Sequence, residues 1–311
     1  MAKIKDDELH NSRLELVFEK RIPGLRVSEA VRHRDFIMRA RHFHETIEIH
    51  FIIDGQRLMF VDQKTFHLTA GTCVLVNHDL IHKTSVVPGA PPDHRNFILQ
   101  LDRAVFDDLL RRLGYPDFDT FGEKFGGITR FSPSEWTLVL AVIDEFKEAC
   151  REVGDNPQAV ADLRTYLYLQ ALELAGIYAR SRKRELTAAW KLDSDSEGLV
   201  FSSGIHKKVH DIAVYLQNNL TEEYTLDGLA ERFFLSKSYM TRVFRTVTGF
   251  SVVEYVTFIR VRKAQSLLRE TGLSVTEIAE QCGFSNITYF EKVFRTATGV
   301  SPGKYRRKDT V

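Results

Sequence analysis

Polar residues that could bind a ligand or a metal ion alternate along residues 41–55, RHFHETIEIHFIIDG. His42, His44 and Glu48 occupy even positions, while apolar residues such as Ile49 occupy odd ones. A period of two predicts a β-strand with one polar and one apolar face. If the polar face points inward, its imidazoles and carboxylate need partners, because unpaired charge is costly to bury. Those partners could be one another, a polar ligand or a metal ion, and an outward face would instead meet water.

A further histidine, His82, lies in the stretch GTCVLVNHDLIH, eleven residues after Gly71. It belongs to a different predicted strand, so it can meet Glu48 only if the sheet closes. The other short strands indicated by the sequence are RLMFV, KTFHL, TCVLV and RNFILQL, and turns with Gly or Asp separate several of them. Short strands at this spacing are typical of an all-β barrel or sandwich.

The two stretches resemble the two cupin motifs. The first has the pattern H-x-H-x3-E-x6-G, and the second has His78 where the usual motif has proline. The resemblance implies a ligand-binding barrel whose ligand or metal contacts fall on His42, His44, Glu48 and His82. Three imidazoles and a carboxylate can hold Fe, Mn, Ni or Zn. A metal site, a metal-free pocket and a plain surface remain three separate interpretations.

The C-terminal part of the chain contains a repeat. Residues 229–251, LAERFFLSKSYMTRVFRTVTGFS, match residues 278–301, IAEQCGFSNITYFEKVFRTATGVS. Each copy has the pattern of two helices joined by a short turn. In the second copy an S-x-x-E capping box begins at Ser274, Gly283 suits the end of the first helix, and Ser285 is expected to cap the next.

The segment between the two copies, Ser251–Glu270, predicts one continuous helix of about 20 residues and about 30 Å. One turn of B-DNA is roughly 34–36 Å long. A rigid spacer of this length could place two recognition helices in successive major grooves, which gives the repeat a physical purpose.

The run from His206 to Lys308 resembles the DNA-binding domain of AraC/XylS-type transcription regulators. The resemblance rests on both helix pairs, on RVRKAQSLL in the linking helix and on TGVSPGKYRR after the second pair. It implies that the second helix of each pair contacts bases. The positions so implied are Lys237, Ser238, Thr241, Arg242 and Arg245 in the first copy, and Asn286, Ile287, Thr288, Glu291 and Lys292 in the second.

Charge and periodicity divide the chain. Residues 204–311 contain 16 Lys and Arg against 11 Asp and Glu, a net charge of +5, while the whole chain carries +1. The rest therefore carries −4, and this asymmetry permits nucleic-acid binding without requiring it. Ser132–Cys150 and Asn156–Arg182 have helical periodicity, and the second is apolar on more than one face, as expected of a buried helix. We expect a barrel at 1–130, a helical dimerisation segment at 131–183, a linker at 184–203 and a DNA-binding domain at 204–311.

The predicted fold is α+β multidomain, with a cupin-like β-barrel and helical dimerisation segment followed by an all-α domain with two helix-turn-helix units. The predicted function is a sequence-specific, ligand-responsive transcription regulator, an activator sensing a sugar or other metabolite. Its partners would be promoter DNA, a small-molecule effector, a second copy of the chain and, for an activator, RNA polymerase. No enzymatic activity and no certain cofactor are expected. The alternatives are a metal-dependent cupin enzyme and a regulator that responds to a divalent metal.

The sequence also indicates the compartment. Its N-terminus lacks the apolar run of a signal peptide, and no apolar run reaches 18 residues, so a cytoplasmic protein without membrane contact is expected. The cysteines, Cys73, Cys150 and Cys282, are odd in number and far apart, which favours reduced thiols over disulfides.

Overall fold

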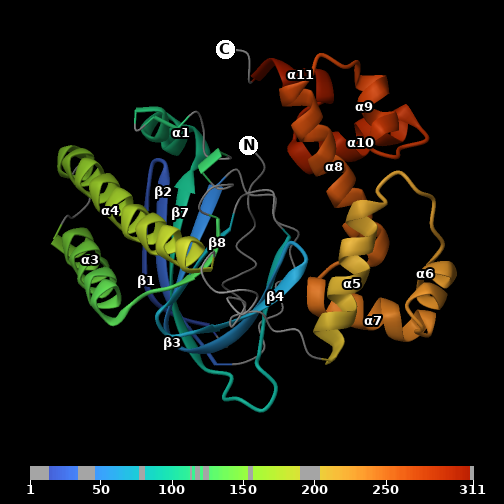
Figure 1. The fold of residues 1–311 in the computed structure, drawn as a ribbon. Helices are drawn as coiled ribbons and strands as arrows, with labels where there is room; N and C mark the ends of the chain where they lie inside the picture. The colour runs from blue at the N-terminus through green and yellow to red at the C-terminus, as the bar shows by residue number, and fades with distance from the viewer. Residues whose placement is uncertain are drawn as a thin grey trace.

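The chain folds into a sheet-rich part and a helical part (Figure 1). Two long helices of the sheet-rich part cover one side of its sheet. The helical part of the chain lies on the other side of that sheet. The computed structural model describes residues 14–33, 46–76, 81–112, 114–115, 120–121, 126–152, 157–189 and 204–308.

Eight strands form the sheet in the described residues, in the order β1-β2-β7-β3-β5-β8, with β4 and β6 paired to β3. Strands were expected at the positions of β4, β5 and β7, but RLMFV is not a separate strand, because it forms the second half of β3. The bounds are β1 Leu14–Ile22, β2 Leu25–Arg32, β3 Thr46–Val61, β4 Lys64–Thr69, β5 Thr72–Val76, β6 His82–Ser85, β7 His94–Asp102 and β8 Gly127–Arg130.

Strand β3 bends in its middle. Its register with β7 shifts between Ile52 and Asp54, and Gly55 follows with a φ of +76°. A Cβ atom at Gly55 would lie 2.4 Å from the carbonyl oxygen of Asp93, so only glycine fits this close approach. Beyond the bend, β3 leaves β7 and β5 and pairs with β4 and β6.

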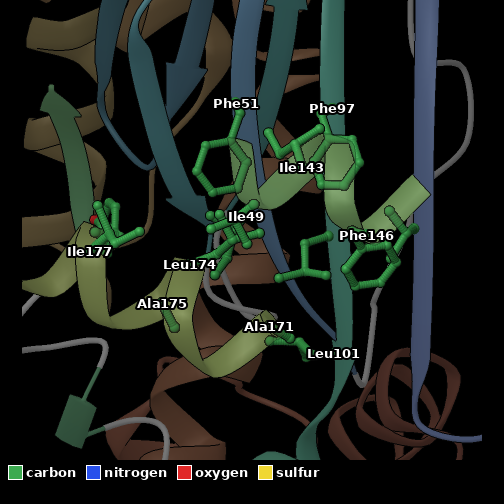
Figure 2. Packing of buried hydrophobic residues seen from close by; sticks show 14 of the residues in the cluster. Ile49, Phe51, Phe97, Leu101, Ile143, Phe146, Ala171, Leu174, Ala175 and Ile177 are labelled. Atoms are coloured by element: carbon green, nitrogen blue, oxygen red, sulfur yellow. The ribbon is translucent and has the colours of Figure 1, made fainter. Parts of the chain in front are cut away.

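The two faces of β3 contribute to different apolar clusters, whereas the alternation predicted one polar and one apolar face. Ile49 and Phe51 pack with Phe97 of β7 and with Phe146 and Leu174 of the helices that cover the sheet (Figure 2). The opposite face contributes to a second cluster, which joins residues from both halves of β3 to β4, β5 and β8. Its buried members are Ile52, Met59, Val61, Leu68, Val74, Val76 and Ile128.

The helices of the sheet-rich part are α1 Arg103–Arg112, α3 Pro133–Glu152 and α4 Pro157–Ala189. Helix α3 begins with a capping box: the Ser132 N–H donates to Glu135 Oε2 at 2.9 Å, and the Glu135 N–H donates to Ser132 Oγ at 3.4 Å. Helix α4 was expected to be buried, but it is not buried on all sides, since Leu169 is 61% exposed.

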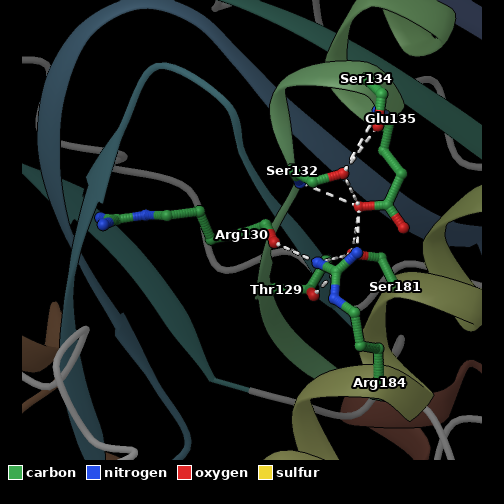
Figure 3. Close-up of polar contacts among 7 residues, drawn as sticks. All are labelled: Thr129, Arg130, Ser132, Ser134, Glu135, Ser181 and Arg184. Carbon is green, nitrogen blue, oxygen red and sulfur yellow. Dashed lines mark hydrogen bonds and ion pairs between the residues drawn. The ribbon is translucent and has the colours of Figure 1, made fainter.

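Helix α4 also continues beyond Arg182, to Ala189, inside the stretch predicted as a linker. Arg184 explains the extension, because it pairs with Glu135 and donates to the carbonyl of Arg130 at 3.2 Å (Figure 3). Burial raises the pKa of the Glu135 carboxyl, but Arg184 and Ser132 outweigh burial and lower that pKa to about 2. The carboxylate is therefore charged at neutral pH and holds the end of α4 against α3.

Seven helices form the described C-terminal part: α5 Gly204–Asn218, α6 Leu226–Arg232, α7 Lys237–Thr248, α8 Val252–Glu270, α9 Val275–Gln281, α10 Ile287–Thr298 and α11 Pro302–Lys308. The pairs α6–α7 and α9–α10 correspond to the two sequence copies. Helix α8 is the continuous helix predicted between them: Val256 and Ile259 join the cluster of the first pair, while Val261 and Ala264 join that of the second.

The predicted helix caps are present with one correction. The capping box at Ser274 and the left-handed Gly283, with a φ of +79°, are both found. In the first copy, the side chain of Ser236 caps α7. The cap of α10 is Asn286 rather than Ser285, since the side chain of Asn286 accepts from the Tyr289 N–H. The extra residue in the second turn moves the cap by one position.

The three cysteines are buried free thiols, as expected. Within the described ranges, none of the helices has the length and apolar character needed to cross a membrane.

Candidate functional site

A buried polar cluster lies on the even-numbered face of β3. Glu48 Oε2 is 2.8 Å from Nε2 of His50 and 3.8 Å from Nε2 of His82, and Gln100 of β7 donates to Glu48 Oε1 at 2.6 Å. Glu48 is 6% and His50 is 8% exposed. The structure therefore brings together Glu48 and His82, which the sequence placed on separate strands.

The cluster continues across the sheet towards β1. Arg26 of β2 donates to Gln100 Oε1 at 3.2 Å and to Glu19 Oε1 at 2.8 Å. Burial raises the pKa of Glu19, but hydrogen bonds and charge from Arg26 and Arg21 lower it overall. The result is a chain of donors and acceptors across β1, β2, β7 and β3, and a chain of this kind can bind a ligand with several polar groups.

The sequence analysis named only part of this cluster. His42 and His44 lie outside the described residues, so their predicted role stays a prediction. His50 and Gln100 were missed as site residues, although the even position of His50 already placed it on the face of Glu48. Within the part of the chain that the structure covers, no three His, Cys, Asp or Glu side chains are grouped to hold a metal ion.

Most of the side chains of α7 that were predicted to contact bases are exposed at the surface of the helical part. Lys237, Ser238 and Arg242 are exposed, and so is Arg245. Lys237 forms an ion pair of 2.8 Å with Asp227 of α6, and both side chains are at least half exposed. Thr241 is half-buried, and its hydroxyl donates to the carbonyl oxygens of its own helix, which leaves it only as an acceptor for another partner.

The corresponding side chains of α10 are exposed as well: Ile287, Thr288, Glu291 and Lys292. Asn286 is engaged in capping, so its amide oxygen already accepts from the Tyr289 N–H at 2.9 Å. The repeat could have identified two further candidates. Arg295 is exposed at the position matching Arg245, and Tyr289, which is 52% exposed, matches Tyr239.

Arg242 extends above the ring of Tyr239, with its guanidinium carbon 5.6 Å from the ring centroid. This contact limits the conformations of a long side chain while its N–H groups remain able to bind acceptors. Arginine in such a position can bind two acceptor atoms of a guanine edge. The second helix of each pair thus presents hydrogen-bonding groups from a rigid element, which can be used to recognise DNA.

Two family models match the chain, one in its sheet-rich part and one in its helical part. The model of the AraC-like ligand binding domain matches residues 27–172, and that of a helix-turn-helix domain matches residues 229–308. The HTH-type transcriptional regulator YfiF of Bacillus subtilis strain 168 is 36% identical over 274 residues, which cover 85% of this chain and 78% of YfiF.

Two further proteins extend the comparison. The HTH-type transcriptional activator RhaS of Escherichia coli strain SE11 is 25% identical over 279 residues, 86% of this chain and 87% of RhaS. Among solved structures, the C-terminal domain of AraT, a response regulator from Geobacillus stearothermophilus, has 36% identity and a TM-score of 0.33. That match covers 34% of this chain and 88% of the AraT domain.

The likeness to YfiF over 85% of the chain and the matches to both family models identify the family. The predicted resemblance is confirmed: the chain belongs to the AraC family of transcription regulators and combines an AraC-like ligand-binding domain with a DNA-binding helix-turn-helix domain.

Proposed function

We propose that the protein recognises a bipartite promoter site through two helix-turn-helix units, with α7 and α10 in successive major grooves. The observation that carries this proposal is the single helix α8, which joins the apolar clusters of both units. Its 19 residues span about 28 Å, close to the roughly 34–36 Å of one turn of B-DNA. The contacting residues would be those predicted on both helices, together with Arg295.

The ligand-binding domain would be a cupin-like barrel that binds a small polar effector. The cluster of Glu48, His50, His82 and Gln100 supplies acceptors and donors in a buried position, as recognition of several hydroxyl or carboxyl groups requires. His42 and His44 are proposed to complete it from the preceding residues. An effector that contacts Glu48 would shift the equilibrium between two arrangements of the protein.

A metal-responsive regulator is the second candidate, and its ligands would be His42, His44, Glu48 and His82, as the cupin resemblance implies. Three imidazoles and a carboxylate are a donor set that Fe, Mn, Ni or Zn accepts, although the described residues alone contain no group of three that could hold a metal ion. Elemental analysis of protein purified without added metal separates the two candidates. Because the related proteins are regulators, the enzyme alternative is the weaker one, and we infer that the protein has no catalytic activity.

The chain is proposed to act as a homodimer in the cytoplasm and, like RhaS by its name, as an activator working with RNA polymerase. The proposed dimer surface is the outer side of the helix pair α3–α4. Three large apolar residues are exposed there: Leu138 at 40%, Tyr166 at 42% and Leu169 at 61%. A contiguous exposed apolar patch is typical of a protein contact, and Tyr166 and Leu169, three positions apart on α4, would form part of such a patch.

Selection of DNA from a random library by the full chain tests the proposed function. The expected product contains two short conserved blocks whose centres lie about 10 bp apart, since each unit contacts one major groove. A single block, or enrichment without sequence preference, would contradict the two-unit proposal.

A further inference from the structure

Strand β6 connects the polar cluster to the first helix-turn-helix unit. The strand has only four residues, His82–Ser85, and neighbouring side chains point to opposite faces. His82 faces Glu48 at 3.8 Å, while the next residue, Lys83, points the other way and donates a hydrogen bond to the carbonyl oxygen of Thr246. One peptide unit thus joins the candidate effector site to the last turn of α7.

Lys83 occupies a position where a cation stabilises a helix. The last carbonyl groups of a helix lack partners within it and carry partial negative charge, which an ammonium group satisfies. Lys83 is 5% exposed, and its Cδ atom would lie 3.4 Å from a Cβ atom placed on Gly249, the left-handed residue that ends α7. The side chain is therefore packed against the end of α7 along its length.

A second set of contacts holds the same two domains together at the β3–β4 turn. Tyr255 of α8 donates its hydroxyl to the Asp62 carbonyl at 2.9 Å, and Arg262 of α8 donates to Asp62 Oδ1 at 3.1 Å. From α5, Gln217 donates to Asp62 Oδ1 at 3.4 Å, and a ring nitrogen of His210 lies 3.0 Å from the Gln63 carbonyl. These contacts reach α5 and α8 beside the first unit.

Apolar contacts accompany these polar ones. Phe60 of β3 and Ile81, the residue before β6, belong to the same buried cluster as Met240 and Phe244 of α7. The second unit has its own cluster, made only of residues from α8 onwards. The ligand-binding domain is therefore packed on the first unit, where it meets the non-recognition side of α7.

This docking leaves the proposed recognition face open. Lys237, Ser238 and Arg242 remain exposed while Lys83 holds the opposite end of α7. The docked arrangement is consequently compatible with DNA contact by the first unit.

We propose that Lys83 is a positioning residue for base recognition by α7, and that β6 transmits changes at Glu48 and His82 to it. The proposal rests on the proposed function, because it requires α7 to contact bases. Loss of the ammonium group removes the contact that orients the end of α7. Base discrimination by the first unit then falls. The second unit, whose apolar cluster contains only residues from α8 onwards, keeps its own discrimination.

The first experiment compares full-length variants on the selected DNA and on versions substituted in one block at a time. Lys83→Met keeps the apolar stem and removes the charge, Lys83→Arg keeps the charge, and Lys20→Met on strand β1 is the matched control. Lys83→Met is expected to lower discrimination at the α7 block about threefold or more, as the size of helix-end charge effects indicates. Discrimination at the α10 block should be unchanged, and Lys83→Arg and Lys20→Met should behave as the wild type.

The outcomes separate a positioning role from a structural one. Equal loss at both blocks accompanied by a lower Tm would mean that Lys83 only stabilises the fold, and a gain of affinity would mean that docking inhibits DNA binding. Either result overturns the proposal. If the wild type selects no bipartite site at all, the proposed function fails instead, before Lys83 is tested.

The second experiment measures the coupling along β6 by a double-mutant cycle of Glu48→Gln and Lys83→Met. Glu48→Gln is expected to change discrimination at the α7 block in the presence of Lys83 and to have less than about half of that effect in the Lys83→Met background. A parallel cycle with Lys20→Met should be additive. Additive effects in both cycles would show that β6 does not carry the signal.

Discussion

Nε2 of His82 lies 3.8 Å from Oε2 of Glu48, although His82 is paired in the sheet with Val61, at the opposite end of the strand that carries Glu48. Both ends of β3 therefore approach the same residue, which the bend at Gly55 makes possible. The polar face of β3 points inward as a consequence, and its carboxylate and imidazoles form one buried cluster.

Glu48→Gln is expected to weaken effector binding at least about tenfold, because a hydrogen bond to a charged group is lost while the shape is kept. The effector can be found by thermal-shift screening of the wild type with sugars, organic acids and divalent metals, since a bound ligand raises Tm. The compound that stabilises the wild type should raise the Tm of the Glu48→Gln variant clearly less. Glu148→Gln, on the exposed face of α3, is the control, and an undiminished shift in Glu48→Gln would exclude Glu48 from the site.

Arg242→Ala should cost about 1–3 kcal/mol of binding free energy on the selected DNA and relax the preference at one base pair, as for a bidentate contact to guanine. The measurement is the affinity for the selected sequence and for each single-base variant of the first block. Arg151→Ala on α3 serves as the control. An equal loss of affinity on every sequence would identify Arg242 as a phosphate contact.

The lowered pKa of the His94 imidazole should make the stability of the protein depend on pH. Burial and the charges of Arg57 and Arg32 lower the pKa of His94 to about 3, and its Nδ1 accepts from Arg57 Nε at 2.9 Å. Below the ordinary pKa of 6.5 the unfolded chain binds a proton that the folded chain does not, so the contribution of His94 is present above that pH and lost as pH falls. The loss is up to about 1.4 kcal/mol per pH unit.

Urea unfolding at pH 7.5 and at pH 5 checks this expectation. His94→Gln keeps an acceptor for Arg57 but does not titrate, so its unfolding free energy should fall less between the two pH values than that of the wild type. His33→Gln, at a largely exposed position, is the control. Equal pH dependence in the wild type and His94→Gln would contradict the assignment of a neutral, buried imidazole.

The turn between α6 and α7 and the turn between α9 and α10 are expected to respond in opposite ways to substitution. Phe234 has a φ of +54° and is 95% exposed, so Phe234→Gly should raise the unfolding free energy by about 0.5–1 kcal/mol by relieving backbone strain. Gly283 has a φ of +79°, and a Cβ atom there would lie 2.6 Å from the Leu220 carbonyl oxygen. Gly283→Ala should therefore destabilise by more than about 1 kcal/mol, and similar effects of both substitutions would refute the comparison.

Local signals in the sequence predicted much of this architecture. The period of two around Glu48 and the period of the helices up to Thr298 were strong enough to place β3 and both helix pairs. The continuity of β3 was missed because Gly55 resembles a turn residue, whereas the structure uses it for a bend inside a strand. The extent of α4 was missed because Arg184 is held by Glu135, a partner far away in the sequence.

The polar cluster could be predicted only in part for the same reason. Alternation alone predicts that His42, His44 and Glu48 share a face, but the contact of Glu48 with Gln100 depends on the register of β3 with β7. The contact between Lys83 and Thr246 joins residues of two domains that are far apart in the sequence. No periodic pattern in the sequence could therefore predict it.

The central claim, that α8 is a rigid spacer between two DNA-contacting units, is tested most directly by changing the spacing of the DNA blocks. Inserting about 5 bp turns the second block to the opposite face of the duplex, and a rigid α8 cannot follow it. We predict that affinity falls to that of a site with only one intact block, and that inserting about 10 bp does not restore it, because the distance then exceeds the reach of α8. Full affinity with either insertion would contradict the account.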